Sequence, residues 1–148
     1  MAVLKRGVLG FWALYFSLVL ASNVADGLKT LGWLGPQFPF ASANYALITR
    51  VTAIHGTPSI VVAVLFIGVL LWEAAATWLF WRAVRRFRRE FRHDGIYAPF
   101  GVAAGLWVIF IVMDEVFISY GLASAHVGLL TLQLVTLLVV VALPEPPR

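Results

Sequence analysis

The stretch PSIVVAVLFIGVLLWEAAATWLFW, residues 58–81, contains a single ionisable side chain, Glu73, in an otherwise apolar or weakly polar run. A helix needs about 20 apolar residues to cross the hydrocarbon core of a bilayer, and this run is long enough. Pro58 suits the first turn of a helix, where its missing N–H group costs no hydrogen bond. The stretch therefore predicts a transmembrane helix that carries a carboxylate inside it.

Three further runs have the same apolar character, at about residues 8–26, 99–120 and 124–143, and prolines follow the last of them. The chain has 148 residues, of which 61% are hydrophobic and 12% charged, and its mean hydropathy is +0.92. Soluble domains carry about 25% charged residues. The sequence therefore predicts one all-α membrane domain over residues 1–148, built as a bundle of four transmembrane helices.

Basic residues gather in two places along the chain. Lys5 and Arg6 precede the first run, and six arginines form a loop between the second and third runs: Arg82, Arg85, Arg86, Arg88, Arg89 and Arg92. Lys and Arg are enriched in cytoplasmic loops, so we expect this loop and both termini on the cytoplasmic side of a bacterial inner membrane. This topology signal accounts for the net charge of +4, so we expect lipids as partners and no nucleic acid.

The connection between the first two runs, about residues 27–57, is too long for a simple turn. Gly and Pro residues interrupt its first half. Ser42 can cap a short helix that runs to about His55, and Gly56 can end it. We expect this short helix to lie on the outer membrane surface.

Polar residues near the predicted spans are the candidate functional residues, because ionisable groups inside membrane helices are costly and mark ion paths, proton relays or buried partners. Four lie inside the spans, namely Glu73, Asp114, Glu115 and Gln133. Five form an outer polar group, namely Asn23, Asp26, Asn44, His55 and His126. Glu73 is expected near the cytoplasmic end of its span, ~15–20 Å from the outer polar group at 1.5 Å per residue.

The helical phase of the third span separates its two carboxylates. Gly101 and Gly105 form a GxxxG motif, which permits close helix contact. Successive residues are rotated by about 100°, so Glu115 projects close to the glycine side and is predicted to face the bundle. Asp114 points about 100° away from it and is predicted to meet lipid, water or a partner subunit.

Some of the same residues are candidate ligands of a metal ion or a haem. Asp26, Glu115, His55 and His126 are plausible metal ligands by type, but no HxxxH or ExxH spacing supports them, so no metal site is predicted. His55 and His126 are weak candidates for haem ligation, which needs both imidazoles facing each other at matched depth. The chain has no cysteine, which excludes disulfides and thiolate metal sites.

A quinone site would combine a histidine or carboxylate near the interface with aromatic walls, which Trp107, Phe110, Phe117 and Tyr120 could supply. The chain has no nucleophile–base pair, no phosphate-binding loop and no dinucleotide motif, so no enzyme activity is predicted. Structural lipids are expected, no cofactor is predicted, and haem or quinone stays open as an alternative.

Five different short motifs follow one another along the chain: Asn23-Val24-Ala25-Asp26, residues 44–51, Trp72-Glu73-Ala74, Gly105-Leu106-Trp107 and Glu115-Val116-Phe117. In this order they resemble the DUF2165 family of predicted small integral membrane proteins, of which the chain looks like a divergent or shortened member. The resemblance implies a four-helix inner-membrane protein of unknown function. It implies no catalytic residue.

The leading functional hypothesis is a non-catalytic subunit that packs against a larger membrane complex, such as a respiratory or photosynthetic one. The small size, the absence of a predicted soluble domain or reaction motif, and the predicted outward position of Asp114 favour it. The alternatives are a small ion or proton carrier that uses Glu73 and Glu115, and a haem- or quinone-binding redox module.

Overall fold

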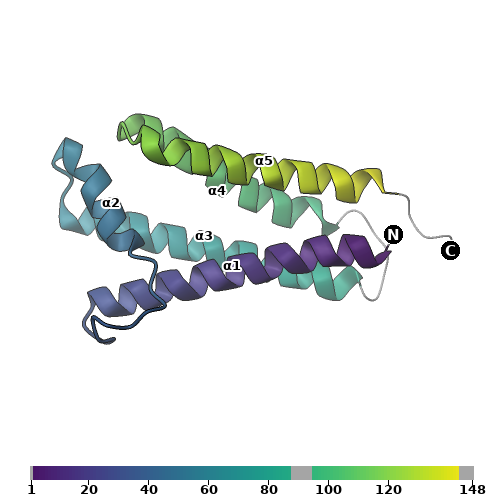
Figure 1. The fold of residues 1–148 in the computed structure, drawn as a ribbon, viewed down its shortest axis with the longest axis horizontal. Helices are drawn as coiled ribbons and strands as arrows, with labels where there is room; N and C mark the ends of the chain where they lie inside the picture. Colours follow the sequence, from purple (N-terminus) through teal and green to yellow (C-terminus); the bar gives the residue numbers. More distant parts are fainter. Residues whose placement is uncertain (1, 88–94, 144–148) are drawn as a thin grey trace.

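The computed structural model describes residues 2–87 and 95–143 (Figure 1). Within these residues the chain forms helices and no strand. Their bounds are α1 Ala2–Thr30, α2 Asn44–Thr52, the 3-10 helix η1 Ala53–His55, α3 Ser59–Phe87, α4 Tyr97–Val116 and α5 Tyr120–Ala142. α1, α3, α4 and α5 are long and apolar enough to cross a membrane. The predicted all-α fold with four membrane helices is confirmed, and the chain is a multi-pass membrane protein.

Three of the helices, α1, α3 and α5, are longer than the spans predicted for them, α1 and α3 the most. α1 and α3 have 29 residues each, which corresponds to about 43 Å at 1.5 Å per residue. The hydrocarbon core of a bilayer is about 30 Å thick, so both helices exceed it. One consequence is that Glu73 lies near the middle of α3, whereas the shorter predicted span placed it near one end.

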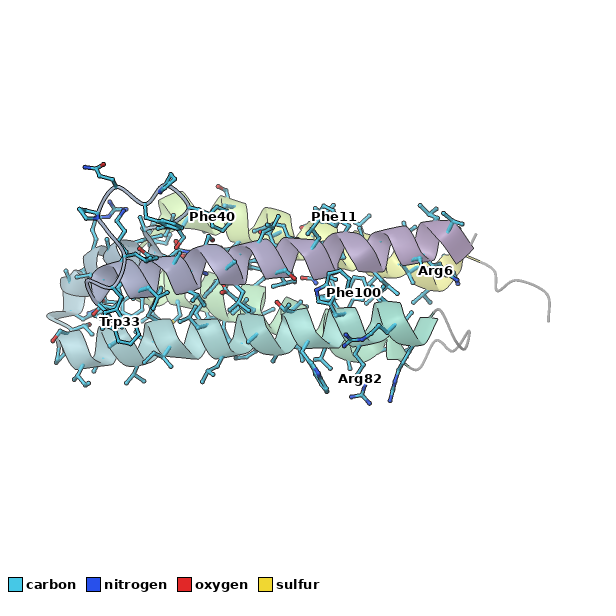
Figure 2. All side chains as sticks on the ribbon, turned by 90° about the horizontal axis from the view of Figure 1, so that it is seen from below. Arg6, Phe11, Trp33, Phe40, Arg82 and Phe100 are labelled. Atoms are coloured by element: carbon cyan, nitrogen blue, oxygen red, sulfur yellow. The ribbon has the colours of Figure 1, made fainter. Side chains whose placement is uncertain are left out.

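The helices form two pairs, because α1 packs along α3 and α4 packs along α5 (Figure 1). Lys5 and Arg6 lie at the start of α1 and Arg82, Arg85 and Arg86 at the end of α3, and we call this end the basic end. The opposite end, which carries α2, is the α2 end. Figure 2 places Arg6 and Arg82 toward the basic end and Trp33 toward the other. The predicted loop residues Arg88, Arg89 and Arg92 lie outside the described residues.

An aromatic cluster joins the two helix pairs. Phe16 of α1 stacks on Phe80 of α3 at 5.8 Å between ring centroids, with 13° between the ring planes. Phe80 meets Phe100 of α4 edge-on at 5.3 Å, and Trp107 of α4 lies 5.9 Å from Phe16. Lipid chains are as apolar as these rings, so close packing rather than exclusion of water stabilises the contact.

Tryptophan N–H groups join neighbouring helices through hydrogen bonds of 2.7 to 2.9 Å. The bonds are Trp12 to Thr136, Trp72 to the Val102 carbonyl, Trp81 to Ser17, and Trp107 to Gln133. The last bond gives Gln133, which was predicted as an intramembrane polar residue, a buried partner on α4. A polar group in hydrocarbon has no water to bind, so each bond also specifies which helix faces lie together.

The start of α2 is capped from a different helix. The preceding residue, Ala43, has a positive φ of 62° and provides no side-chain cap. The carboxylate Oδ2 of Asp26 in α1 accepts the Tyr45 N–H at 2.7 Å and the Ser42 hydroxyl at 3.4 Å. Ser42 Oγ in turn accepts the Asn44 N–H at 3.2 Å. The predicted cap at Ser42 is thus part of a larger one, centred on Asp26.

The other end of this segment is attached to α4. Gly56 has a φ of 62° and ends η1, as the sequence predicted, with its N–H bonded to the Ala53 carbonyl. The Nε2–H of His55 donates to the Val116 carbonyl at 2.9 Å, and the imidazole lies 5.6 Å from the Phe117 ring. The α2–η1 segment therefore bridges α1 and α4.

Replacing Asp26 with Leu should loosen α2. Loss of a helix cap costs about 1 kcal/mol, so we expect roughly five-fold faster amide hydrogen exchange across residues 44–52. Asp26→Asn is the matched control, because its side-chain oxygen can still accept the Tyr45 N–H. Equal exchange rates in the Leu variant and the wild type would show that Asp26 does not hold α2.

Candidate functional site

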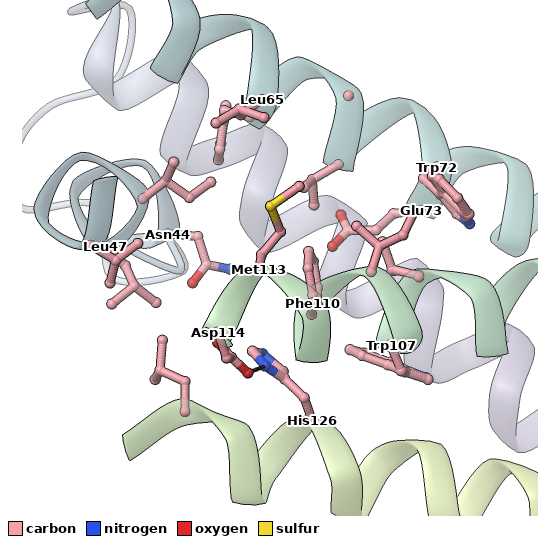
Figure 3. Close-up of a pocket in the computed structure, with 18 of the residues that line it drawn as sticks. Asn44, Leu47, Leu65, Trp72, Glu73, Trp107, Phe110, Met113, Asp114 and His126 are labelled. Atoms are coloured by element: carbon pink, nitrogen blue, oxygen red, sulfur yellow. Dashed lines mark hydrogen bonds and ion pairs between the residues drawn. The ribbon is translucent and has the colours of Figure 1, made fainter. Parts of the chain in front are cut away.

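A cavity of about 590 Å³ lies between the two helix pairs, toward the α2 end (Figure 3). Side chains from all five α-helices line it. Ligand sites in proteins typically measure about 300–1,000 Å³ and are mostly apolar with a few polar groups. The described lining residues are likewise mostly apolar, with a few polar side chains among them. Its aromatic members are Tyr15, Phe66, Trp72, Trp107, Phe110 and Phe117.

The first polar element at the cavity is a chain of three side chains, of which Glu73 and Asn44 belong to the lining. Asn23 Nδ2 donates to both carboxylate oxygens of Glu73, at 2.7 and 2.9 Å. Asn44 Nδ2 donates to Asn23 Oδ1 at 2.8 Å. Glu73 is 2% exposed and Asn23 1% exposed. The two amides thus connect α2, α1 and α3 and stabilise a carboxylate away from water.

The expected separation of Glu73 from the outer polar group is wrong, because Glu73 binds Asn23 directly. The depth was estimated from a span ending near residue 81, whereas α3 runs from Ser59 to Phe87 and places Glu73 at its middle. Among the described residues, no hydrogen bond links Glu73 to Glu115, so a continuous relay between them has no support.

The second polar element is the pair formed by Asp114 and His126. Asp114 Oδ2 lies 2.6 Å from His126 Nδ1, a hydrogen bond that becomes an ion pair when the imidazole is protonated. His126 packs against Phe110, with ring centroids 5.0 Å apart. The pair lies on the α5 side of the cavity and Glu73 on the α3 side (Figure 3).

The predicted orientation of the two neighbouring carboxylates is wrong. Asp114 is 4% exposed, whereas Glu115 is exposed together with Val108 and Val112. The GxxxG motif gave the wrong face, because Gly101 is exposed and has open space around its Cα.

The true interior face of α4 is a different helical row. It follows Phe100, Ala103, Trp107 and Asp114, at spacings of three, four and seven residues. These positions project to one side of a helix. Gly105 does permit a close approach, since a methyl group there would lie 3.2 Å from the Trp72 ring. One glycine of the motif thus contacts α3, but the carboxylate that faces the interior is set by the larger side chains and by His126.

The remaining predicted site residues have separate roles. Asp26 caps α2, His55 binds the Val116 carbonyl, and neither lines the cavity that His126 lines. In residues 2–87 and 95–143, no group of three or more His, Cys, Asp or Glu could hold a metal ion. The outer polar group therefore divides: Asn23 and Asn44 join Glu73, and His126 joins Asp114.

Several lining residues were not singled out from the sequence. Tyr15, Phe66 and Met113 contribute to the cavity wall, yet apolar side chains also cover the lipid-facing surface of every helix, so nothing in the pattern distinguishes them. The Asn23–Glu73 bond had a usable signal, because a buried carboxylate needs a donor within the protein. Asn23 is the donor that the first span offers near that depth.

Comparison of the chain with protein-family models, curated proteins and solved structures finds no match. The resemblance to the DUF2165 family therefore stays a prediction.

Removing the Glu73 acceptor should destabilise the protein. In Glu73→Leu, the Asn23 amide stays buried without its partner, which costs about 1–3 kcal/mol. Glu73→Gln retains a side-chain oxygen that can accept from Asn23 Nδ2, so its loss should be smaller. Thermal unfolding in detergent measures both. If the Leu variant unfolds at the same temperature as the wild type, the bond does not contribute to stability.

Proposed function

We propose that the protein binds a lipophilic small molecule inside the membrane, in the cavity between the two helix pairs. The single observation that carries this proposal is the cavity of about 590 Å³, whose wall is built from all five α-helices. Its aromatic side chains suit an apolar body. Its two polar elements, Glu73 with Asn44 and Asp114 with His126, suit a polar head group.

Access from the bilayer supports the proposal. The cavity edge includes Val64 and Gly68 of α3 and Ile109 of α4, all exposed. The exposed apolar faces of membrane helices contact lipid chains, so a lipophilic molecule dissolved in the bilayer can reach this edge without crossing water. Quinones belong to this class of ligand. Haem held by both histidines gains no support, because His55 bonds to Val116 outside the cavity lining.

A bulky side chain at Gly68 should block the cavity. A Cβ atom added there meets no atom within 4 Å, so Gly68→Phe can be accommodated. We expect Gly68→Phe to lose at least about ten-fold in affinity for a lipophilic probe such as a short-chain quinone, followed by quenching of tryptophan fluorescence. Trp72 and Trp107 lie in the lining and can report binding.

Gly128→Phe is the matched control for this experiment. Gly128 lies on α5, is exposed, has the same open surroundings and does not line the cavity. Equal probe affinity in the two variants and the wild type would show that the probe binds the lipid-facing surface and would contradict the proposal.

A second candidate is a non-catalytic subunit of a larger complex in a bacterial inner membrane. The sequence predicted that Asp114 is the carboxylate that points outward. In the structure this position belongs to Glu115, which is exposed beside Val108 and Val112, at 47% and 53% exposure. A carboxylate on an otherwise apolar helix face favours a partner helix that supplies a donor there.

This candidate predicts specific cross-linking from α4. A photoreactive residue at Val112 should capture one discrete membrane protein in native membranes, because a partner helix would cover this face. The same group at Leu138 of α5, which is 67% exposed, is the control. Lipid adducts alone at both positions would rule out a stable partner on the Glu115 face.

A further inference from the structure

The cavity has an acidic lining that its own residues compensate only in part. Its described ionisable side chains are Glu73, Asp114, His126 and Tyr15, and no Lys or Arg is among the described lining residues. Asp114 has His126 at 2.6 Å as a potential cation. The hydrogen-bond donor to Glu73 is the neutral amide of Asn23. Glu73 is therefore the carboxylate for which the described lining provides no countercharge.

The Glu73 carboxylate also has unused hydrogen-bonding capacity. Two carboxylate oxygens offer about four acceptor positions. The one amide nitrogen of Asn23 is shared by both oxygens, at 2.7 and 2.9 Å. Because Glu73 lines the cavity, a molecule in the cavity is placed to meet the remaining positions. An uncompensated charge in this medium is costly, so a bound cation would be stabilised strongly.

Aromatic rings line the same cavity as this carboxylate. Trp72, Trp107, Phe110 and Tyr15 belong to the lining together with Glu73 (Figure 3). The face of an aromatic ring attracts cations, and aromatic cages are a known means of recognising quaternary ammonium groups. The rings and the carboxylate thus favour the same charge on a ligand, while the apolar remainder of the wall favours a lipophilic body.

We infer that the cavity binds a lipophilic organic cation, an amine or quaternary ammonium compound, with Glu73 as its counter-ion. This inference rests on the proposed function and specifies the charge of the ligand. A neutral molecule such as a quinone would fill the space but leave Glu73 without a countercharge. An anionic lipid would place like charges together in a medium of low dielectric constant.

Two matched probes test the sign of the charge. One is an aryl-alkyl trimethylammonium ion, and the other is its tert-butyl isostere, in which carbon replaces the nitrogen. Binding to the purified protein in nanodiscs is followed by tryptophan fluorescence. The signal that remains in the Gly68→Phe variant, whose cavity is blocked, measures how much of each probe enters the lipid instead. We expect the cation to bind the wild type at least about ten-fold more tightly than the isostere.

Glu73→Gln removes the charge and retains an oxygen that can accept from Asn23. It should lower affinity for the cation about ten-fold or more while leaving affinity for the isostere within about two-fold. Glu115→Gln makes the same charge change on the exposed face of α4 and should alter neither affinity. If Glu73→Gln does not fold, the comparison of the two probes on the wild type still decides whether the cavity prefers a cation.

The possible outcomes separate the two proposals. Equal wild-type affinity for both probes, each lost in Gly68→Phe, overturns the inference of a cationic ligand and leaves a binding cavity for neutral molecules. Binding of neither probe above the Gly68→Phe background overturns the cationic ligand. Failure of the short-chain quinone as well overturns the proposed function.

Discussion

The buried carboxylate of Glu73 constrains the whole α2 end of the molecule, because hydrocarbon cannot solvate it. Its donor must come from the protein, and Asn23 of α1 provides it. The Asn23 oxygen then accepts from Asn44, the first residue of α2. One carboxylate thus constrains how α1 faces α3 and, through the asparagines, connects both to the start of α2 that Asp26 caps. The aromatic contacts nearer the basic end tolerate small rotations of a helix, but hydrogen bonds of this length do not.

The cavity exists because the two ends of the bundle are built differently. Toward the basic end, rings from α1, α3 and α4 fill the interior, with Phe80 in contact with both Phe16 and Phe100. Toward the α2 end, polar pairs and the α2–η1 segment join the helices instead. That segment is held by Asp26 on one side and by Val116 on the other. Polar pairs and the α2–η1 segment fill less of the interior than aromatic rings do. The space that they leave between the helix pairs is the cavity of the candidate site.

The neighbouring residues Asp114 and Glu115 show why helical phase was hard to predict. In water, the apolar side of a helix indicates its interior face. In a membrane both faces are apolar, so the rotation was inferred from Gly101 and Gly105 alone. The structure instead buries Asp114, because His126 of α5 lies within hydrogen-bond distance. The interior face of α4 thus depends on His126, which lies on another helix. The local sequence of α4 carries no information about this partner.

The membrane class, the four long helices, the short helix ended by Gly56 and the identity of the polar residues could all be predicted from the sequence, because length, hydropathy and turn residues are local properties. Which polar groups meet became visible only in the folded bundle: Glu73 with Asn23, and Asp114 with His126. These contacts depend on the rotation and offset of whole helices. Helices that are apolar on every side do not encode rotation locally; the pairing of their few polar groups determines it.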